Sequence, residues 1–489
     1  MPCTTILVGK KASYDGSTLI ARNDDSPSGQ FHVKKMVVVQ PSDQPRHYQA
    51  VESGVKIELP DNPLRYTACP NVDPSEGIWA ASGINSLNVS MSATETITSN
   101  PRVLGADPYV KKMCDANGKK YPGGIGEEDL VVLVLPYIHS AREGVLRLGS
   151  LLQEYGTYEP NGIAFSDKDE IWWLETIGGH NWIARRVKDE EYVVMPNQFG
   201  MDKFDFEDAY GEKKENLCSP ELKTITDKYH LALDIDDDFN PRLAYGSHTD
   251  SDHIYNTPRA WFMERYLNPR TCVWDGIDAD FSPESDDIPW AMVPERKITI
   301  EDVKYLLSSH YQQTEYDPYS KINSPKKNMY RSIGVNRTSF MSIAQIRNDV
   351  KEEFSAIEWV CFGSNVFNAM IPLYTNCDVI PEYLGNTSLT VSTDNFYWAS
   401  RLLGVMADSC YNFSAIHIER YQDAMANIAH ETIDKYDDEM SLSEDISSLI
   451  DDANAYLAIR GKELTDAVLN KVLFESSMHM KNAFSRSDN

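Results

Sequence analysis

The sequence predicts an α+β fold, because strand-like and helix-like blocks alternate along its 489 residues. Residues 1–95 and about 161–195 hold short apolar runs separated by Gly, Pro and Asp turns, a pattern typical of strands. Apolar positions at helical spacing dominate from about residue 394 onward. The sequence shows no repeat, no low-complexity tract and no obvious linker, so we expect one large domain with elaborations.

The first two predicted strands form a hairpin. Residues 3–9 are followed by a turn at Asp15-Gly16 and by a second strand over residues 17–21. That strand ends in the charged string Arg22-Asn23-Asp24-Asp25. Arg and Asp side chains are costly to bury unless they are paired, so pairing around a reactive site is one explanation of the string. A solvated turn is the other.

Helix signals follow in the middle of the chain. Ser140 and Glu143 have the spacing of a capping box that opens a helix, and Gly156 ends it. Thr299 caps a second helix that runs through about Ser309. The remaining segments are an irregular acidic stretch with short helices at about 202–295, and strands near 339–345 and 356–361.

A separate helical pattern begins at about residue 441. Its apolar residues form one stripe, which consists of Leu449, Ile450, Ala453, Tyr456 and Leu457, and its acidic residues form a solvated face. We expect residues 441–489 to be a helical extension that packs against the main domain, residues 3–440, or against a second subunit.

Composition restricts the class of ligand. The chain carries 74 acidic and 46 basic residues, for a formal net charge of −28, which argues against nucleic acids and anionic membranes as partners. The longest apolar run, Leu130 to Leu135, is too short to span a bilayer, and the amino terminus lacks the pattern of a secretory signal. Small molecules or peptides remain as the expected ligands.

The cysteine pattern indicates a reducing compartment. Eight cysteines are scattered without a Cys-x-x-Cys pair, at positions 3, 69, 114, 218, 272, 361, 377 and 410. This spacing offers neither a zinc site nor a compact disulfide framework. We therefore expect a cytoplasmic protein without a metal or cofactor.

Cys3 is the candidate nucleophile. A thiol reacts as its thiolate, which a nearby cation stabilises or a base produces, and Arg22 is the candidate cation. If Met1 and Pro2 were removed, the α-amino group of Cys3 would serve as the base, because α-amines titrate near about 7.7–8.0. Asp25 would hold that amine in place. The alternative is an inert, small apolar Cys3 at the terminus.

The hairpin resembles the amino-terminal signature of the N-terminal nucleophile hydrolases, in the branch of the family C69 dipeptidases, secernins, penicillin V acylases and bile salt hydrolases. Those proteins begin their mature chain with Cys-Thr and carry an Arg-Asn-x-Asp string. Similarity continues in Gly83-Ile84-Asn85, in the paired strands at 169–175 and 180–187, and in Pro196-Asn197-Gln198-Phe199. The resemblance extends from residue 3 to about 430 and is closest to the C69 dipeptidases.

The resemblance implies an αββα four-layer sandwich with added carboxyl-terminal helices, and the activity of a cysteine dipeptidase. It implies that Asn197 stabilises the oxyanion and that Arg259 is a late active-site arginine. Glu95 falls where the acylases face their substrate, and a carboxylate there would bind the free amine of a dipeptide. Asp24 is a second candidate contact to the substrate. The resemblance also implies a homo-oligomer.

The implied mechanism begins with removal of the leader, residues 1–2. The Cys3 thiolate then attacks the scissile carbonyl, its α-amino group moves the proton, and Arg22 and Asp25 set the charge state of the nucleophile. Pro2 departs from the simplest pattern, because removal of Met1 alone leaves Pro-Cys and a second cleavage is required. Two alternatives stay open: an acylase of N-acyl amino acids or conjugated bile salts, and a non-catalytic, secernin-like binding protein.

Overall fold

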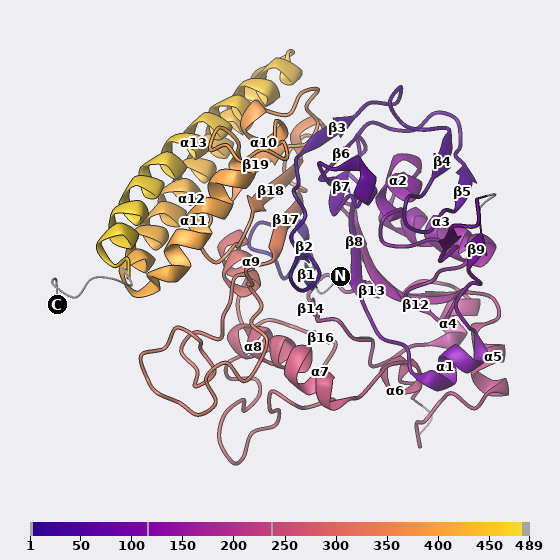
Figure 1. The fold of residues 1–489 in the computed structure, drawn as a ribbon. Coiled ribbons are helices and arrows are strands. Elements are labelled where there is room, and N and C mark those ends of the chain that lie inside the picture. The colour runs from indigo at the N-terminus through magenta and orange to yellow at the C-terminus, as the bar shows by residue number, and fades with distance from the viewer. Residues whose placement is uncertain (1–2, 115–116, 236–237, 482–489) are drawn as a thin grey trace.

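The computed structural model describes residues 3–114, 117–235 and 238–481, apart from the side chains of residues 93–95. Within these residues, blocks of strands alternate with blocks of helices, which confirms the predicted α+β class (Figure 1). Most of the described strands belong to two antiparallel sheets, and the long carboxyl-terminal helices lie together on one side of the molecule (Figure 1).

The first sheet contains the amino-terminal strand. Its order is β16-β14-β1-β2-β17-β18-β19, and each neighbouring pair is antiparallel. In that order the strands span Ala291–Met292, Tyr192–Met195, Thr4–Val8, Thr18–Asp25, Thr338–Ile346, Ala356–Phe362 and Ile371–Tyr374. Because β1 lies between β2 and β14, the end of β2 and the distant end of β14 both lie beside the start of β1, next to Cys3.

The second sheet has the order β15-β13-β12-β11-β8-β7. Its strands span Asn216–Cys218, Asn181–Val187, Ile171–Ile177, Asn161–Ser166, Ser90–Thr96 and Ser82–Ile84. Three strand pairs complete the described β structure: β3 with β6 (Val37–Val39, Tyr66–Ala68), β4 with β5 (His47–Gln49, Lys56–Glu58) and β9 with β10 (Met113–Cys114, Lys120–Tyr121).

The helices are short before residue 396 and long after it, apart from α3. The described α-helices are α1 Pro101–Ala106, α2 Leu130–Val134, α3 Ala141–Tyr155, α4 Phe206–Tyr210, α5 Leu222–Lys228, α6 Pro241–Tyr245, α7 Asp250–Tyr255, α8 Thr257–Leu267, α9 Ile300–Leu307, α10 Glu382–Gly385, α11 Phe396–Ser409, α12 Tyr411–Leu442 and α13 Ile446–Met478. Single 3₁₀ turns are η1 Pro74–Glu76, η2 Leu135–Tyr137 and η3 Glu352–Phe354.

The predicted helix starts are confirmed. Ser140 Oγ accepts from the backbone N of Glu143 and opens α3, which Gly156 ends. In a complete capping box, the side chain of Glu143 would accept from the backbone N of Ser140. Here Glu143 Oε2 accepts instead from the backbone N of His139, one residue earlier. Thr299 opens α9 with a complete capping box to Asp302.

The structure changes one boundary in the amino-terminal hairpin. The charged string was expected to follow the second strand, but β2 runs through it to Asp25, and its eight residues are all buried. Pairing with β1 on one side and β17 on the other extends the strand. The string is therefore buried inside the first sheet, and the alternative of a solvated turn is wrong.

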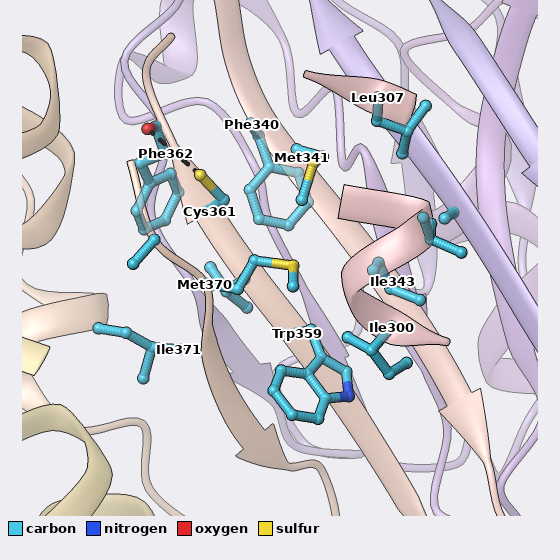
Figure 2. Close-up of a cluster of buried hydrophobic side chains, with 14 of the residues drawn as sticks. Ile300, Leu307, Phe340, Met341, Ile343, Trp359, Cys361, Phe362, Met370 and Ile371 are labelled. Carbon is cyan, nitrogen blue, oxygen red and sulfur yellow. Dashed lines mark hydrogen bonds between the residues drawn. The ribbon is translucent and has the colours of Figure 1, made fainter. Parts of the chain in front are cut away.

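Three apolar clusters account for most of the buried core. One lies where the first sheet meets α8, α9 and α11–α13, and Figure 2 shows part of it around Trp359, Met370 and Phe362. A second packs α2 and α3 against the second sheet. The third contains Leu7, Ile20 and Trp173, which come from both sheets, so it lies between them.

The carboxyl-terminal helix α13 is part of the first cluster. Ile450, Ala453 and Leu457 of the predicted stripe are buried, whereas Tyr456 is half exposed. A Cβ atom added at Gly461 would lie 2.4 Å from Cδ1 of Ile371 in β19, so the helix and the sheet approach closely there. No helix among the described residues has the length and apolar character needed to cross a membrane.

Candidate active site

Cys3 immediately precedes β1 and is fully buried. Its Sγ lies 2.9 Å from Nη2 of Arg22, which is on the neighbouring strand β2. Antiparallel pairing brings the two residues together, because Thr5 lies opposite Arg22 and residues two apart on a strand share a face. The structure therefore provides the cation beside the thiol that the sequence predicts.

A buried charge network holds Arg22 in place. Nη2 also contacts Asp24 at 3.2 Å and Glu127 at 2.8 Å, while Nη1 donates to the carbonyl of Ala81 at 2.9 Å. Burial by itself lowers the pKa of Arg22, but the negative charges of Cys3, Asp24 and Glu127 outweigh burial and raise it. The guanidinium stays charged and available to stabilise a thiolate.

Asp24 is tied to cations on both of its oxygens. Lys34 Nζ lies 3.1 Å from Oδ2, and Arg22 contacts Oδ1. Burial raises the pKa of Asp24, but the charges of Lys34 and Arg22 outweigh burial and hold that pKa below its ordinary value. The observed contacts of Asp24 position Arg22, and its contact with substrate stays a prediction.

One arrangement in this network has the spacing of a metal site. Sγ of Cys3 and one oxygen each of Asp24 and Glu127 lie within 4.8 Å of one another. Nη2 of Arg22 lies within 3.2 Å of each of these three atoms. A metal ion at this point would have to displace the guanidinium, so in this arrangement the three groups are partners of Arg22.

Arg259 of α8 connects the backbone of Cys3 to Asn197. Its Nη1 donates to the carbonyl of Cys3 and, at 2.7 Å, to Thr4 Oγ1, and its Nη2 donates to Asn197 Oδ1 at 2.8 Å. The Asn197 amide donates to the carbonyl of Thr96 at 3.0 Å. Asn197 follows β14, which pairs with β1, so both residues predicted from the family resemblance lie beside Cys3.

The side chain of Asp25 has different partners from the side chains of Arg22 and Asp24. Its Oδ2 accepts from Nη2 of Arg331, and its Oδ1 accepts from Thr338 Oγ1 at 2.5 Å. Since residues one apart on a strand point to opposite faces, the side chain of Asp25 points away from that of Asp24. Its expected contact with the α-amino group of Cys3 stays a prediction, because the nitrogen of Cys3 is an amide until residues 1–2 are removed. Those two residues lie outside the described part of the chain.

The side chain of Glu95 falls outside what the structure describes. The backbone of Glu95 pairs with Gly162 in the second sheet, but its side chain is outside the described set. Its expected contact with a substrate amine is therefore untested.

The sequence did not point to three residues of this site: Glu127, Lys34 and Arg331. Each contacts the charged string from a sequence distance of about ten residues or more, through loops whose paths depend on the whole fold. The only local signal is the acidic run Glu127-Glu128-Asp129, which precedes an apolar stretch. Acidic runs are usually solvated, so this one did not indicate that Glu127 belongs to the site.

A cavity of about 460 Å³ lies next to Asn197. Most of its lining residues carry a hydroxyl or amide group, and they are Thr96, Thr98, Asn197, Ser247, Thr249, Ser251, Asp252, Tyr255 and Asn256. Asn256 donates to the carbonyl of Asn197 and to Asp252, which fixes the inner wall. The cavity adjoins Asn197, whose Oδ1 is joined through Arg259 to the backbone carbonyl of Cys3.

Comparison with known proteins identifies the family of the chain. The profile of peptidase family C69 matches residues 2–424. A dipeptidase from Bifidobacterium longum is 48% identical over 532 residues, and the match covers 100% of both chains. A probable dipeptidase A from Streptococcus pyogenes is 50% identical, over 99% of this chain and 98% of the relative. A probable dipeptidase B from Lactococcus lactis is 44% identical over the same shares. The chain belongs to peptidase family C69.

Proposed function

We propose that this protein is a dipeptidase that cleaves the peptide bond of dipeptides with a free amino terminus through an acyl-enzyme at Cys3. The observation that carries the proposal is the 2.9 Å contact between Cys3 Sγ and Arg22 within a buried charge network. The names of relatives that match nearly the whole chain support the substrate class. The eight free cysteines support a reducing compartment such as the cytoplasm.

The first half of the reaction forms a thioester. Arg22 stabilises the Cys3 thiolate, which attacks the carbonyl carbon of the scissile bond. The amide of Asn197, after turning from Thr96, stabilises the oxyanion together with backbone donors. The protonated α-amino group of Cys3 then gives its proton to the leaving nitrogen, and the second amino acid departs.

The second half releases the first amino acid. The α-amino group, now neutral, takes a proton from water while the water oxygen attacks the thioester carbonyl. The tetrahedral intermediate collapses, the carbon–sulfur bond breaks and the thiolate is regenerated beside Arg22. This sequence requires that residues 1–2 be removed, because an amide nitrogen at Cys3 is not a base.

The arrangement of sheets and helices supports the N-terminal nucleophile hydrolase fold. Two antiparallel sheets share a core cluster, and helices pack against the outer side of each one. We propose that these are the four layers of an αββα sandwich, with α13 as the main part of the added helical extension. The position of Cys3 immediately before a central strand of the first sheet supports this assignment.

A comparison of two cysteine variants tests the proposal. Cys3→Ala should abolish hydrolysis of a mixed dipeptide panel, and iodoacetamide should inactivate the wild-type protein. Cys114 is exposed, so Cys114→Ala is the matched control and should keep full activity and full sensitivity to the reagent. Full dipeptide hydrolysis by Cys3→Ala would refute the mechanism. Hydrolysis of N-acyl amino acids but not of dipeptides would favour an acylase.

A further inference from the structure

The residues around Cys3 divide into an acidic side and a basic side. The thiol faces Arg22, and Arg22 contacts Glu127. The backbone carbonyl of Cys3 faces Arg259 instead. Beyond these contacts a second carboxylate, Glu159, follows Glu127, and two further arginines lie near Arg259.

On the acidic side, Glu127 leads to Glu159. The backbone N of Glu127 donates to Oε1 of Glu159 at 2.7 Å, which fixes that carboxylate next to the Arg22 network. Glu159 is half-buried, and no basic side chain of the described residues lies within 4.0 Å of it. Burial, and then the charge of Glu127, raise the pKa of Glu159. An ammonium group placed there would relieve both effects.

On the basic side, three guanidinium groups surround one aromatic ring. The carbon atoms Cζ of Arg259, Arg331 and Arg337 lie 5.5, 5.1 and 6.0 Å from the ring centroid of Tyr255. Tyr255 also lines the cavity beside Asn197. In a chain whose net charge is −28, three guanidinium groups at one ring, one of them paired with Asp25, form a local positive region beside that cavity.

Arg337 is the member of this group that is available to a ligand. Arg331 is paired with Asp25, and Arg259 is buried against Cys3, Asn197 and Asn256. Arg337 is half-buried, donates to the hydroxyl of Tyr255, and has no carboxylate of the described residues within 4.0 Å. A guanidinium in this state can bind a carboxylate through two parallel hydrogen bonds.

We propose that the two charged ends of a dipeptide are recognised on opposite sides of Cys3, the amine by Glu159 and the carboxylate by Arg337 beside Tyr255. The inference rests on the proposed function and adds the direction in which the substrate lies. The residue that forms the thioester carries the amine, and the leaving residue carries the carboxylate. A longer peptide replaces one of these charges by an amide and leaves its partner without an ion pair, so the site selects for length.

The test uses one dipeptide in three forms: unmodified, amino-terminally acetylated, and carboxyl-terminally amidated. Arg337→Met should raise KM for the unmodified dipeptide about 10- to 100-fold, since a hydrogen bond to a charged group is lost. The same variant should leave KM for the amide unchanged, and Arg337→Lys should recover part of the loss. Glu159→Gln keeps the acceptor for Glu127 N, and it should raise KM for the unmodified and amidated forms only.

Arg265→Met is the matched control, because Arg265 is on the same helix as Arg259 but pairs with Asp275 away from the cavity. It should leave all KM values unchanged. Equal losses on the unmodified and amidated forms in Arg337→Met would overturn the carboxylate contact, and equal losses on all three forms in Glu159→Gln would overturn the amine contact. Failure of the proposed function is a separate result: the wild-type protein would hydrolyse none of the forms, or Cys3→Ala would hydrolyse them equally well.

Discussion

Arg22 and Cys3 lie on neighbouring segments of one sheet, with Nη2 of the arginine 2.9 Å from Sγ of the cysteine. The contact is buried, and Asp24 and Glu127 hold the guanidinium from the other side. Arginine cannot lose its proton in the working pH range, so its stabilisation of the thiolate does not depend on pH. The pH dependence of the reaction of Cys3 with thiol reagents therefore follows the thiol alone, and a change in it measures the effect of Arg22.

Replacing Arg22 should slow the reaction of Cys3 with thiol reagents. We expect Arg22→Met to lower the iodoacetamide rate at neutral pH and to move the pH–rate profile of alkylation upward, because the thiolate loses its cation. The variant should also lose about 3–5 kcal/mol of stability, since two buried carboxylates lose a partner. Mass mapping of the alkylated cysteine at a series of pH values checks the first effect, and urea unfolding checks the second. An unshifted profile in a folded variant would contradict the role of Arg22.

Asn197 should act on the chemical step more than on binding. We expect Asn197→Ala to lower kcat about 10²- to 10³-fold with a smaller change in KM, because a donor to an oxyanion is used only in the transition state. Steady-state kinetics on one dipeptide measures both constants. Asn348→Ala is the control, since that amide donates to Gly16 on the exposed surface. A rise in KM with unchanged kcat would assign Asn197 to substrate binding instead.

Glu358 should make stability depend on pH. Burial raises its pKa from 4.5 to about 7, although Ser82 Oγ donates to it at 2.5 Å. The folded protein then holds a proton that the unfolded chain releases, so the free energy of unfolding falls as the pH rises from about 4.5 to about 7. The loss from this group is on the order of 3 kcal/mol.

Glu358→Gln should remove that loss. Urea unfolding at pH 5 and pH 8 should show a smaller pH effect in the variant than in the wild type, while Glu353→Gln, a change at an exposed carboxylate, should behave as the wild type. Equal pH effects in all three proteins would mean that Glu358 is solvated or paired in a way that cancels its burial.

Two glycines should respond oppositely to alanine. At Gly461 a Cβ atom would lie 2.4 Å from Cδ1 of the buried Ile371, so Gly461→Ala should lower the free energy of unfolding by about 1–3 kcal/mol. At Gly105 of α1 a Cβ atom meets nothing within 4 Å, and Gly105→Ala should raise stability by about 0.5–1 kcal/mol. Urea unfolding of both variants measures the difference. A stabilised Gly461→Ala would show that α13 does not pack tightly on β19.

The sequence predicted the local structure and the contact of Cys3 with Arg22. Capping residues such as Thr299 and Ser140 act within one turn, so their helices could be placed from neighbouring residues alone. Arg22 could be assigned because strand pairing places it beside the nucleophile. Glu127 and Lys34 could not, because the loops that carry them reach the site only through the packing of the whole fold.

The same reason explains the outcome for the charged string. Because unpaired charged side chains are costly to bury, the string from Arg22 to Asp25 had either to be paired or to face solvent. The choice depended on Lys34, Glu127 and Arg331, whose positions no local pattern reveals.

The most direct test of the mechanism is intact mass spectrometry of the protein, quenched with acid during dipeptide turnover and followed by amino-terminal sequencing of the free enzyme. We predict a chain that begins at Cys3 and carries, in the quenched sample, one aminoacyl group on that residue. Iodoacetamide treatment before the substrate should prevent the adduct. An active chain that still begins at Met1 or Pro2, or turnover with an acyl group absent from Cys3 under conditions that trap thioesters, would contradict the account.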